Sequence, residues 1–205
     1  IRSQDEVDKL ISEGYSFSPS TPGPGDFLYK DLNNDKKIDD NDRVLKGQPI
    51  PLVNYGGTIA VGYKGFDFNL LFNGVAGWNR YLSSGIFSLN NASDERMLLA
   101  KYKNQWSETN KNTNIPKLYT GNEKNNQISD YYLYDASFLR IKNMQLGYTL
   151  PSSVRDRIKL NSIRVYCNLE NFFTITDYPG MDPEMDGDLG YPIIKTISLG
   201  VNIKF

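Results

Sequence analysis

One acidic stretch of the sequence, residues 31–42, has residue types and spacing that could bind a divalent cation. With Asp31 as the first position, oxygen-bearing side chains occupy positions 1, 3, 5, 9 and 12. Hard oxygen ligands at this spacing wrap Ca²⁺ in an EF-hand loop, in which the seventh residue contributes its backbone carbonyl. The pattern predicts a structural Ca²⁺ or Mg²⁺ site formed by Asp31, Asn33, Asp35, Lys37, Asp39 and Asp42.

Two residues of this stretch depart from the EF-hand pattern and keep a second interpretation open. Lys36 stands at the sixth position, where glycine normally makes the sharp turn. Asp42 is shorter than the bidentate glutamate that usually closes the loop. The alternative is a solvated acidic turn that binds no metal. A bound cation would be structural and would make the loop rigid. Nothing in this stretch suggests a catalytic role.

The residues that most enzyme mechanisms need are missing. The sequence has no histidine and a single cysteine, Cys167, which excludes Ser-His-Asp and Cys-His catalysis and histidine-ligated zinc. A glycosidase with two carboxylates about 5–9.5 Å apart needs no histidine, but the acidic residues here cluster in loops. We therefore predict that the chain is not an enzyme. The net charge of −1 gives no basic excess that would favour nucleic acid as a partner.

Two further groups of residues could contact a ligand. The acidic residues of the segment 177–192 could bind a cation or a basic partner, although such a run is more often solvated. Four aromatic residues could stack on a ligand, although packing against their own loop is the commoner role. The acidic group is Asp182, Glu184, Asp186 and Asp188, and the aromatic group is Trp78, Tyr81, Trp106 and Tyr119. A helix is predicted within the loop region, over residues 93–106, with Ser93 as its N-cap.

Alternating strands must position these groups. Apolar residues alternate with polar ones over 54–64 and 66–74, and the two-residue turn Lys64-Gly65 joins these segments. The same alternation marks three later segments, 134–150, 162–173 and 194–205. In the first of these the phase shifts by one residue near Lys142, which predicts a β-bulge. The apolar side chains of the second and last segments are Phe66, Phe68, Leu70, Phe72, Ile197, Leu199, Val201, Ile203 and Phe205.

Two architectures accommodate strands with one apolar and one polar face. In a transmembrane β-barrel the apolar residues face lipid and the polar ones face the lumen. In a secreted β-sandwich, here a calcium-binding carbohydrate-binding module, the apolar face packs on a second sheet. The connections between the five segments are alternately short and long, as in an outer-membrane barrel with short periplasmic turns and long outer loops. This pattern predicts extracellular loops, a periplasmic C-terminus and lipid-facing apolar residues.

Several motifs, together with the terminal Phe205, resemble the SusC/RagA family of TonB-linked outer-membrane transporters. The matching segments are Gly25–Asp39, Tyr63–Asp67, Ala136–Asn143, Leu146–Pro151, Asn171–Thr174 and Asp182–Glu184. The resemblance implies an all-β chain: the last five or so antiparallel strands of a transmembrane barrel of about 22 strands with a lumen plug. Residues 1–53 would form an extracellular loop segment, and residues 54–205 the barrel strands and their loops.

The resemblance also implies a function and a set of partners. The family imports oligosaccharides, or in some members peptides, across the outer membrane of Gram-negative bacteria. Expected partners are the rest of the barrel and its plug, a SusD-like surface lipoprotein, the TonB complex through a segment outside this sequence, and outer-membrane lipid. We expect no redox or organic cofactor.

Overall fold

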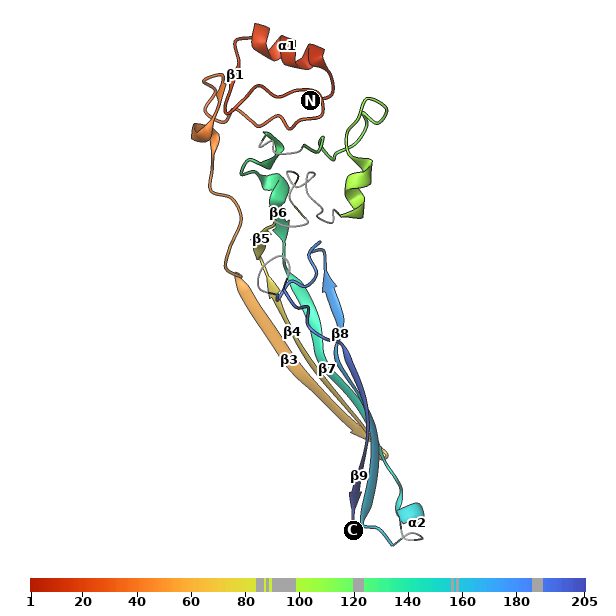
Figure 1. Ribbon diagram of the computed structural model, residues 1–205. Helices are drawn as coiled ribbons and strands as arrows, with labels where there is room; N and C mark the ends of the chain where they lie inside the picture. The colour runs from red at the N-terminus through yellow and green to blue at the C-terminus, as the bar shows by residue number, and fades with distance from the viewer. Residues whose placement is uncertain are drawn as a thin grey trace. The chain divides into compact units, whose positions relative to one another are not determined.

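The computed structural model describes residues 1–83, 87, 89, 99–119, 124–155, 157, 159–185 and 190–205 (Figure 1). These residues pack as two compact units. One unit contains residues 1–47 and 81–133, and the other contains residues 48–80 and 134–205. Each unit is therefore built from two separate parts of the chain, whereas the sequence predicts a single boundary after residue 53.

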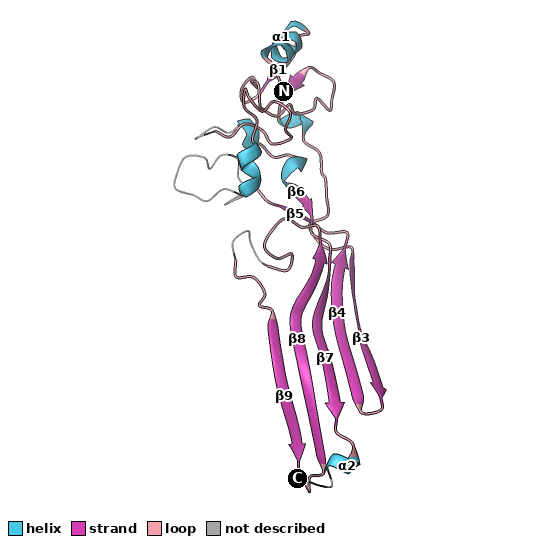
Figure 2. Ribbon diagram, turned by 90° about the vertical axis from the view of Figure 1, so that its right-hand side faces the viewer, coloured by secondary structure: helices cyan, strands magenta, loops and turns pink. Residues whose placement is uncertain are grey.

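The second unit is built on one antiparallel five-stranded sheet (Figure 2). Its spatial order is β3-β4-β7-β8-β9, so neighbouring strands follow one another along the chain except where the short strands β5, Asn79–Tyr81, and β6, Leu133–Asp135, intervene. The five strands correspond to the five predicted segments. Their bounds are Val53–Tyr63 for β3, Phe66–Ala76 for β4, Phe138–Thr149 for β7, Ser162–Thr176 for β8 and Thr196–Lys204 for β9.

A tight turn fixes the register between β3 and β4. Tyr63 pairs with Phe66, so Lys64 and Gly65 alone form the connection, as predicted. Lys64 has a φ of 46° and Gly65 a φ of 86°. Two consecutive positive φ values are those of a type I′ turn, whose twist matches that of the strands it joins. The turn therefore keeps the alternation of both strands on a common face.

Replacing Gly65 by alanine is expected to destabilise this hairpin by about 1–2 kcal/mol, because a left-handed backbone conformation strains any residue with a Cβ. The added Cβ would also lie 2.8 Å from the carbonyl oxygen of Thr149. The measurement is the urea midpoint for unfolding of the intact protein. Lys64→Asn is the matched control and should leave the midpoint unchanged or raised, since asparagine tolerates this conformation. A Gly65→Ala protein with the wild-type midpoint would contradict the turn assignment.

The phase shift near Lys142 is a β-bulge, as the sequence predicts. The ladder between β7 and β8 is continuous on both sides but skips Lys142, and its register shifts between Ile141 and Asn143. The ladder between β4 and β7 shifts at the same place, between Leu71 and Phe72. The bulge lets Arg140 and Asn143, which differ by three positions, both lie on the polar face.

The two faces of the sheet differ sharply in chemistry. Across the middle of the sheet, successive register partners form one row of apolar residues on a single face: Val61, Phe68, Leu146, Cys167 and Leu199. The next row lies on the opposite face and is mostly polar: Ala60, Asn69, Gln145, Asn168 and Ser198. The described residues leave much of the apolar face open, and Leu199 is 82% exposed.

The first unit combines short elements with long loops. Helix α1, Gln4–Ser12, is capped by Ser3, whose side chain accepts a hydrogen bond from the backbone N–H of Glu6. Strands β1 and β2, Ser16–Phe17 and Lys37–Ile38, pair in parallel. A small core forms around the buried residues Leu89, Tyr102 and Tyr132. The remaining elements are the 3₁₀ helices η1 Asp40–Asp42, η3 Ala100–Asn104, η4 Lys124–Asn126 and η5 Asp130–Tyr132.

The helix predicted over residues 93–106 is tested only in part. Residues 93–98, which include the predicted N-cap, lie outside the described residues. Within the described part, Ala100–Asn104 forms a 3₁₀ helix. Strands β5 and β6, Asn79–Tyr81 and Leu133–Asp135, form a separate two-stranded sheet, and the short helix α2 spans Ser152–Arg155. Among the described residues, no helix combines the length and apolar character needed to span a membrane.

Candidate functional site

The polar face of the sheet is cross-linked by an ion pair that spans three strands. Arg164 on β8 reaches across β7 to Asp67 on β4, and its Nε donates to Asp67 Oδ2 at 2.8 Å. Its Nη2 also donates to the Gln145 Oε1 at 2.8 Å. Gly147 lies beneath this bridge on β7, where any side chain would overlap both Arg164 and Asp67. Glycine at this position therefore makes the long-range pairing possible.

A second polar cluster lies on the same face, closer to the bulge. The Nδ2 of Asn143 donates to the Oδ1 of Asn168 at 2.9 Å, and the Nδ2 of Asn168 donates to the Oε1 of Glu170 at 2.9 Å. Asn168 is buried. Together the two clusters satisfy polar side chains across neighbouring strands, as buried or half-buried polar groups require.

The segment that follows β8 is held against the sheet by salt bridges. Arg140 has a side chain only 1% exposed, and its Nη2 lies 2.6 Å from the Asp182 Oδ1. Its Nη1 lies 3.0 Å from the Glu184 Oε2, which Lys142 also contacts at 2.8 Å. Lys142, which the bulge leaves without a register partner in the β7–β8 ladder, is therefore a second cation that contacts Glu184. We call Arg140, Lys142, Asp182 and Glu184 the loop clamp.

Arg80 strengthens the loop clamp through the backbone. Its Nη1 donates to the carbonyl oxygen of Pro183 at 3.2 Å and also to that of Met185. Its guanidinium group lies 5.6 Å from the ring centroid of Trp78 and 5.5 Å from that of Tyr178. Three cations therefore converge on residues 182–185, because the carboxylates and the two carbonyls all accept from them.

The loop clamp shows the role of two of the acidic residues in the segment 177–192, for which the sequence left a cation, a basic partner or solvent as alternatives. Asp182 and Glu184 pair with basic side chains of the same chain, and Asp182 is buried rather than solvated. The other two members of that group, Asp186 and Asp188, lie outside the described residues. Spacing alone offered no signal for the choice of partner, since 42 residues separate Arg140 from Asp182 and Lys142 from Glu184.

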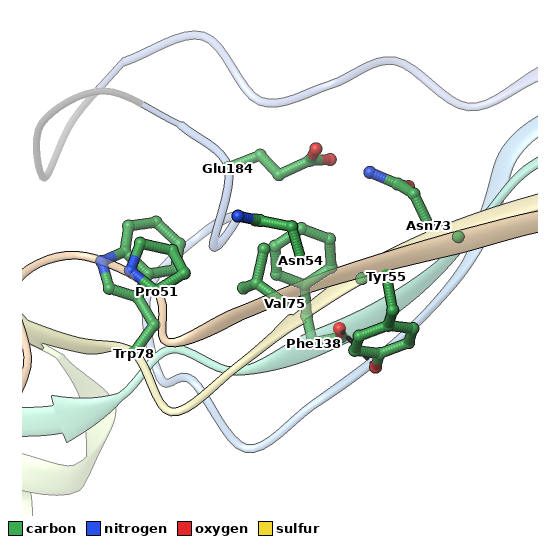
Figure 3. A pocket seen from close by; sticks show the side chains of 10 residues that line it. Pro51, Asn54, Tyr55, Asn73, Val75, Trp78, Phe138 and Glu184 are labelled. Atoms are coloured by element: carbon green, nitrogen blue, oxygen red, sulfur yellow. Dashed lines mark hydrogen bonds between the residues drawn. The ribbon is translucent and has the colours of Figure 1, made fainter.

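An open hollow of about 510 Å³ lies beside the loop clamp (Figure 3). Asn54 and Gly56 of β3 and Asn73 of β4 line it. Glu184 extends over these strands from the clamped loop. Figure 3 shows the ring of Tyr55 on the far side of these strands. The remaining lining residues are mainly apolar: Pro51, Gly74, Val75, Trp78 and Phe138. The hollow therefore joins amide groups to an apolar rim.

The acidic stretch 31–42 forms a loop whose side chains cap its own backbone. Asp31 accepts hydrogen bonds from the backbone N–H groups of Asn34 and Lys36, and Asp35 accepts one from that of Lys37. Lys36 has a φ of 62°, so a lysine adopts the conformation that glycine usually provides at the sixth position. Among the described residues, no three acidic, histidine or cysteine side chains are grouped to hold a metal ion.

Asp42 closes the acidic loop electrostatically. Its carboxylate accepts hydrogen bonds from the backbone N–H groups of Asp39 and Leu32 at 3.0 and 2.7 Å. These bonds, first that from Asp39, lower the pKa of Asp42 below its usual value. Because they favour the ionised form, they weaken only as the pH falls through that lowered pKa.

By strand register, the predicted lipid-facing residues within β4 and β9 lie on the apolar face, where Phe66 and Leu199 are among the exposed members. Phe205 follows the last residue of β9 and is 90% exposed. The four aromatic residues proposed as ligand contacts are dispersed. Trp78 borders the hollow, whereas Trp106 is buried, Tyr81 packs edge-on against Tyr132, and Lys117 lies over the ring of Tyr119. The hollow therefore retains one of these four as a candidate ligand contact.

Comparison with known proteins identifies the relatives of this chain. No family model matches it. It is 33% identical over 208 residues to TonB-dependent receptor P3 of Formosa agariphila and 31% identical over 198 residues to TonB-dependent receptor SusC of Bacteroides thetaiotaomicron. The alignments cover 94% and 89% of this chain. The chain matches the SusC/RagA family of TonB-dependent receptors.

Solved structures of the RagAB peptide transporter support the SusC/RagA match. One of them superimposes with a TM-score of 0.65 and 30% identity, and another, the 'open-open' state of the RagAB peptide importer, with a TM-score of 0.61 and 28% identity. Each covers 78% of this chain but 18% of the solved chain. The chain likewise spans about a fifth of the length of the SusC and P3 receptors.

The family resemblance inferred from the motifs is thus confirmed, and an outer-membrane location is supported with it. The relatives are receptors and transporters rather than enzymes, which agrees with the lack of histidine. Two of the SusC/RagA-like motifs, 136–143 and 182–184, are joined by the loop clamp. In the described structure, the charged residues of these two motifs therefore pair with each other.

Proposed function

We propose that the chain forms five C-terminal strands of a large transmembrane β-barrel, of about 22 strands as the family resemblance implies, in a TonB-dependent transporter that imports oligosaccharides or peptides. The observation that carries this proposal is the sheet itself, with one open apolar face and one face of linked polar groups. Burial of apolar area is worth about 25 cal/mol per Å², so a wide apolar face needs an apolar environment. Outer-membrane lipid provides it.

The β-sandwich alternative requires a second sheet over the apolar face. Within the described residues the sheets other than the five-stranded one have two short strands each, of two or three residues. Such strands are too short to cover a sheet whose strands are nine or more residues long. This mismatch favours the barrel.

The two edge strands favour the barrel as well. Strands β3 and β9 each pair with one neighbour in the five-stranded sheet, so one edge of each carries free backbone N–H and C=O groups. In lipid such groups must be paired, and a closed barrel pairs them. The rest of the same barrel, which also holds the plug, would provide the partner strands.

The loop lengths suggest how the chain would be oriented. The turn at Lys64-Gly65 and the connection from β7 to β8 would lie in the periplasm, and so would the C-terminus. The loop clamp, the hollow and the acidic loop would lie toward the cell exterior, where a SusD-like lipoprotein would cover them. Energy would reach the transporter from the TonB complex.

Uptake by cells tests the proposed function. A strain that lacks the whole receptor is expected to lose growth on the oligosaccharides or peptides that the receptor imports, and the wild-type gene is expected to restore it. Removal of the partner lipoprotein should reduce uptake from dilute substrate. Unchanged growth and uptake after receptor deletion, across both substrate classes, would contradict the proposal.

We further propose that the acidic loop binds one structural Ca²⁺, with Mg²⁺ as the alternative ion, as its oxygen spacing suggests. Added Ca²⁺ is expected to slow cleavage of the intact receptor by Lys-C at Lys36 and Lys37, because an ordered loop resists proteolysis. Asp31→Ala should abolish this protection. Glu108→Ala, in another exposed loop, is the matched control and should retain it. Identical cleavage rates of the wild type with Ca²⁺ and with a chelator would contradict calcium binding.

A further inference from the structure

The apolar face of the sheet has a groove of about 500 Å³ in addition to its flat surface. Strand β8 contributes the small side chains of Val165 and Cys167 to its lining. The flanking strands contribute larger ones, Leu146 and Tyr148 from β7 and Leu199 from β9. Because β8 lies between β7 and β9, its smaller side chains leave a depression along the strand. The volume is within the roughly 300–1,000 Å³ of known ligand pockets.

Aromatic residues border the end of the groove that is nearest the β3–β4 turn. Phe66 lines the groove and packs against Tyr148, with the two ring centroids 4.5 Å apart. Tyr63, the register partner of Phe66, extends this row to β3. In outer-membrane barrels, aromatic rings gather where the hydrocarbon meets the lipid headgroups. The row therefore indicates the depth at which a headgroup would lie beside this groove.

A basic residue stands next to this aromatic row, on the apolar side of the sheet. The Nζ of Lys64 lies 5.2 Å from the ring centroid of Tyr63, whose side chain belongs to the apolar face. Asp67, three residues further along, does not neutralise it. That carboxylate lies on the polar face, where Arg164 donates to it at 2.8 Å. The ammonium group of Lys64 is therefore positioned to meet an anion at the depth of the headgroups.

The connection from β7 to β8 adds positive charge beside the same turn. The backbone N–H of Thr149, at the end of β7, donates to the carbonyl oxygen of Gly65 at 2.7 Å, so the two turns lie at the same end of the sheet (Figure 2). Arg157 and Lys159 of this connection are exposed. Its sequence has three basic residues against one acidic residue, Asp156, which lies outside the described residues.

We propose that the groove and the two turns form a binding site for one anionic phospholipid, whose acyl chain occupies the groove and whose phosphate group contacts Lys64, Arg157 and Lys159. Phosphate oxygens accept charge-assisted hydrogen bonds from ammonium and guanidinium groups. Phe66 and Tyr148 are each two residues from the start of a turn, so the groove ends within roughly 7 Å of both turns.

The inference rests on the proposed barrel and adds one specific lipid to its surroundings. Because the two turns would lie in the periplasm, the lipid would belong to the periplasmic leaflet of the outer membrane. The lipids elsewhere around the barrel need no such charge, since the apolar face alone attracts their acyl chains.

Native mass spectrometry of the full receptor, purified in detergent, tests the site with two lipids. Phosphatidylglycerol is the anionic probe, and phosphatidylcholine with the same acyl chains is the zwitterionic one. The wild type is expected to bind one phosphatidylglycerol about 10-fold more tightly than phosphatidylcholine, because basic residues near the membrane surface attract anionic lipid. The triple variant Lys64→Gln/Arg157→Gln/Lys159→Gln is expected to bind the two lipids equally, within about 2-fold.

Lys204→Gln is the matched control for charge. Lys204 lies at the same end of the sheet, but its register partner is Ser162, on the polar face. This variant should keep the preference for phosphatidylglycerol. Equal affinity of the wild type for the two lipids, or an unchanged preference in the triple variant, would overturn the site. A loss in Lys204→Gln as large as that in the triple variant would also overturn it, since net charge alone would then explain the preference.

Filling the groove tests the position of the acyl chain. Cys167→Phe places a ring inside the groove and is expected to weaken binding of both lipids about 10-fold, as for lost contact with roughly two methylene groups. Val61→Phe is the matched control, since Val61 belongs to the same row of the apolar face but lies outside the groove. It should bind both lipids like the wild type. Unchanged binding by the Cys167→Phe receptor would contradict an acyl chain in this groove.

Cell fractionation separates this inference from the proposed function. If the receptor is recovered from outer membranes with the heat-modifiable mobility of a folded barrel, yet shows no preference between the two lipids, the lipid site is wrong and the barrel assignment stands. If the receptor is absent from the outer-membrane fraction of cells that produce it, the barrel itself is wrong and the lipid site falls with it.

Discussion

Leu199→Arg is expected to prevent the receptor from assembling in the membrane. Leu199 is 82% exposed on the apolar face, in the middle row of the sheet that also contains Phe68. An arginine on the lipid face near the middle of the bilayer costs about 2–4 kcal/mol. We expect the variant to be absent from outer-membrane fractions and to lack the heat-modifiable gel mobility of a folded barrel.

Two neighbouring residues on β4 provide the matched comparison. Phe68→Arg should fail in the same way, because Phe68 is on the apolar face in the same row as Leu199. Asn69→Arg should assemble normally, since the adjacent Asn69 is on the polar face, together with its register partners Ala60 and Gln145. Equal assembly of the Phe68 and Asn69 variants would contradict the assignment of the two faces.

Arg140→Ala is expected to release the clamped loop from the sheet. Arg140 is 1% exposed, and its loss leaves the largely buried Asp182 without its cation. Breaking a buried ion pair from one side costs about 3–5 kcal/mol. Cleavage after Glu184 by a glutamate-specific protease should therefore become at least about 100-fold faster, provided that local opening precedes cleavage.

Lys142→Ala is the control for the loop clamp. Lys142 is 29% exposed, and Glu184 would keep its contact with Arg140 at 3.0 Å. A partly exposed pair is worth about 1 kcal/mol or less, so cleavage should accelerate by no more than about 5-fold. Similar acceleration in both variants would show that Arg140 is not the principal anchor of the loop.

The strands, their two faces and the family could all be predicted from the order of residue types. Alternation of apolar and polar residues has a period of two, which is a local property of a strand, so the order of residue types is enough to locate the five strands. The Lys64-Gly65 turn and the bulge at Lys142 are equally local, because each leaves its mark within a few residues. Motifs spread along the chain are enough to indicate SusC/RagA relatives.

The partners of the charged residues could not be predicted from the sequence, because they depend on the folded arrangement of the strands. Asp67 meets Arg164, and Asp182 meets Arg140, across 97 and 42 residues of sequence. The distance between such partners depends on strand order, on register and on the space that Gly147 leaves open, none of which spacing along the chain encodes. The hollow arises in the same way, since Asn54, Asn73 and Glu184 become neighbours only when the strands pair and the loop folds back onto their polar face.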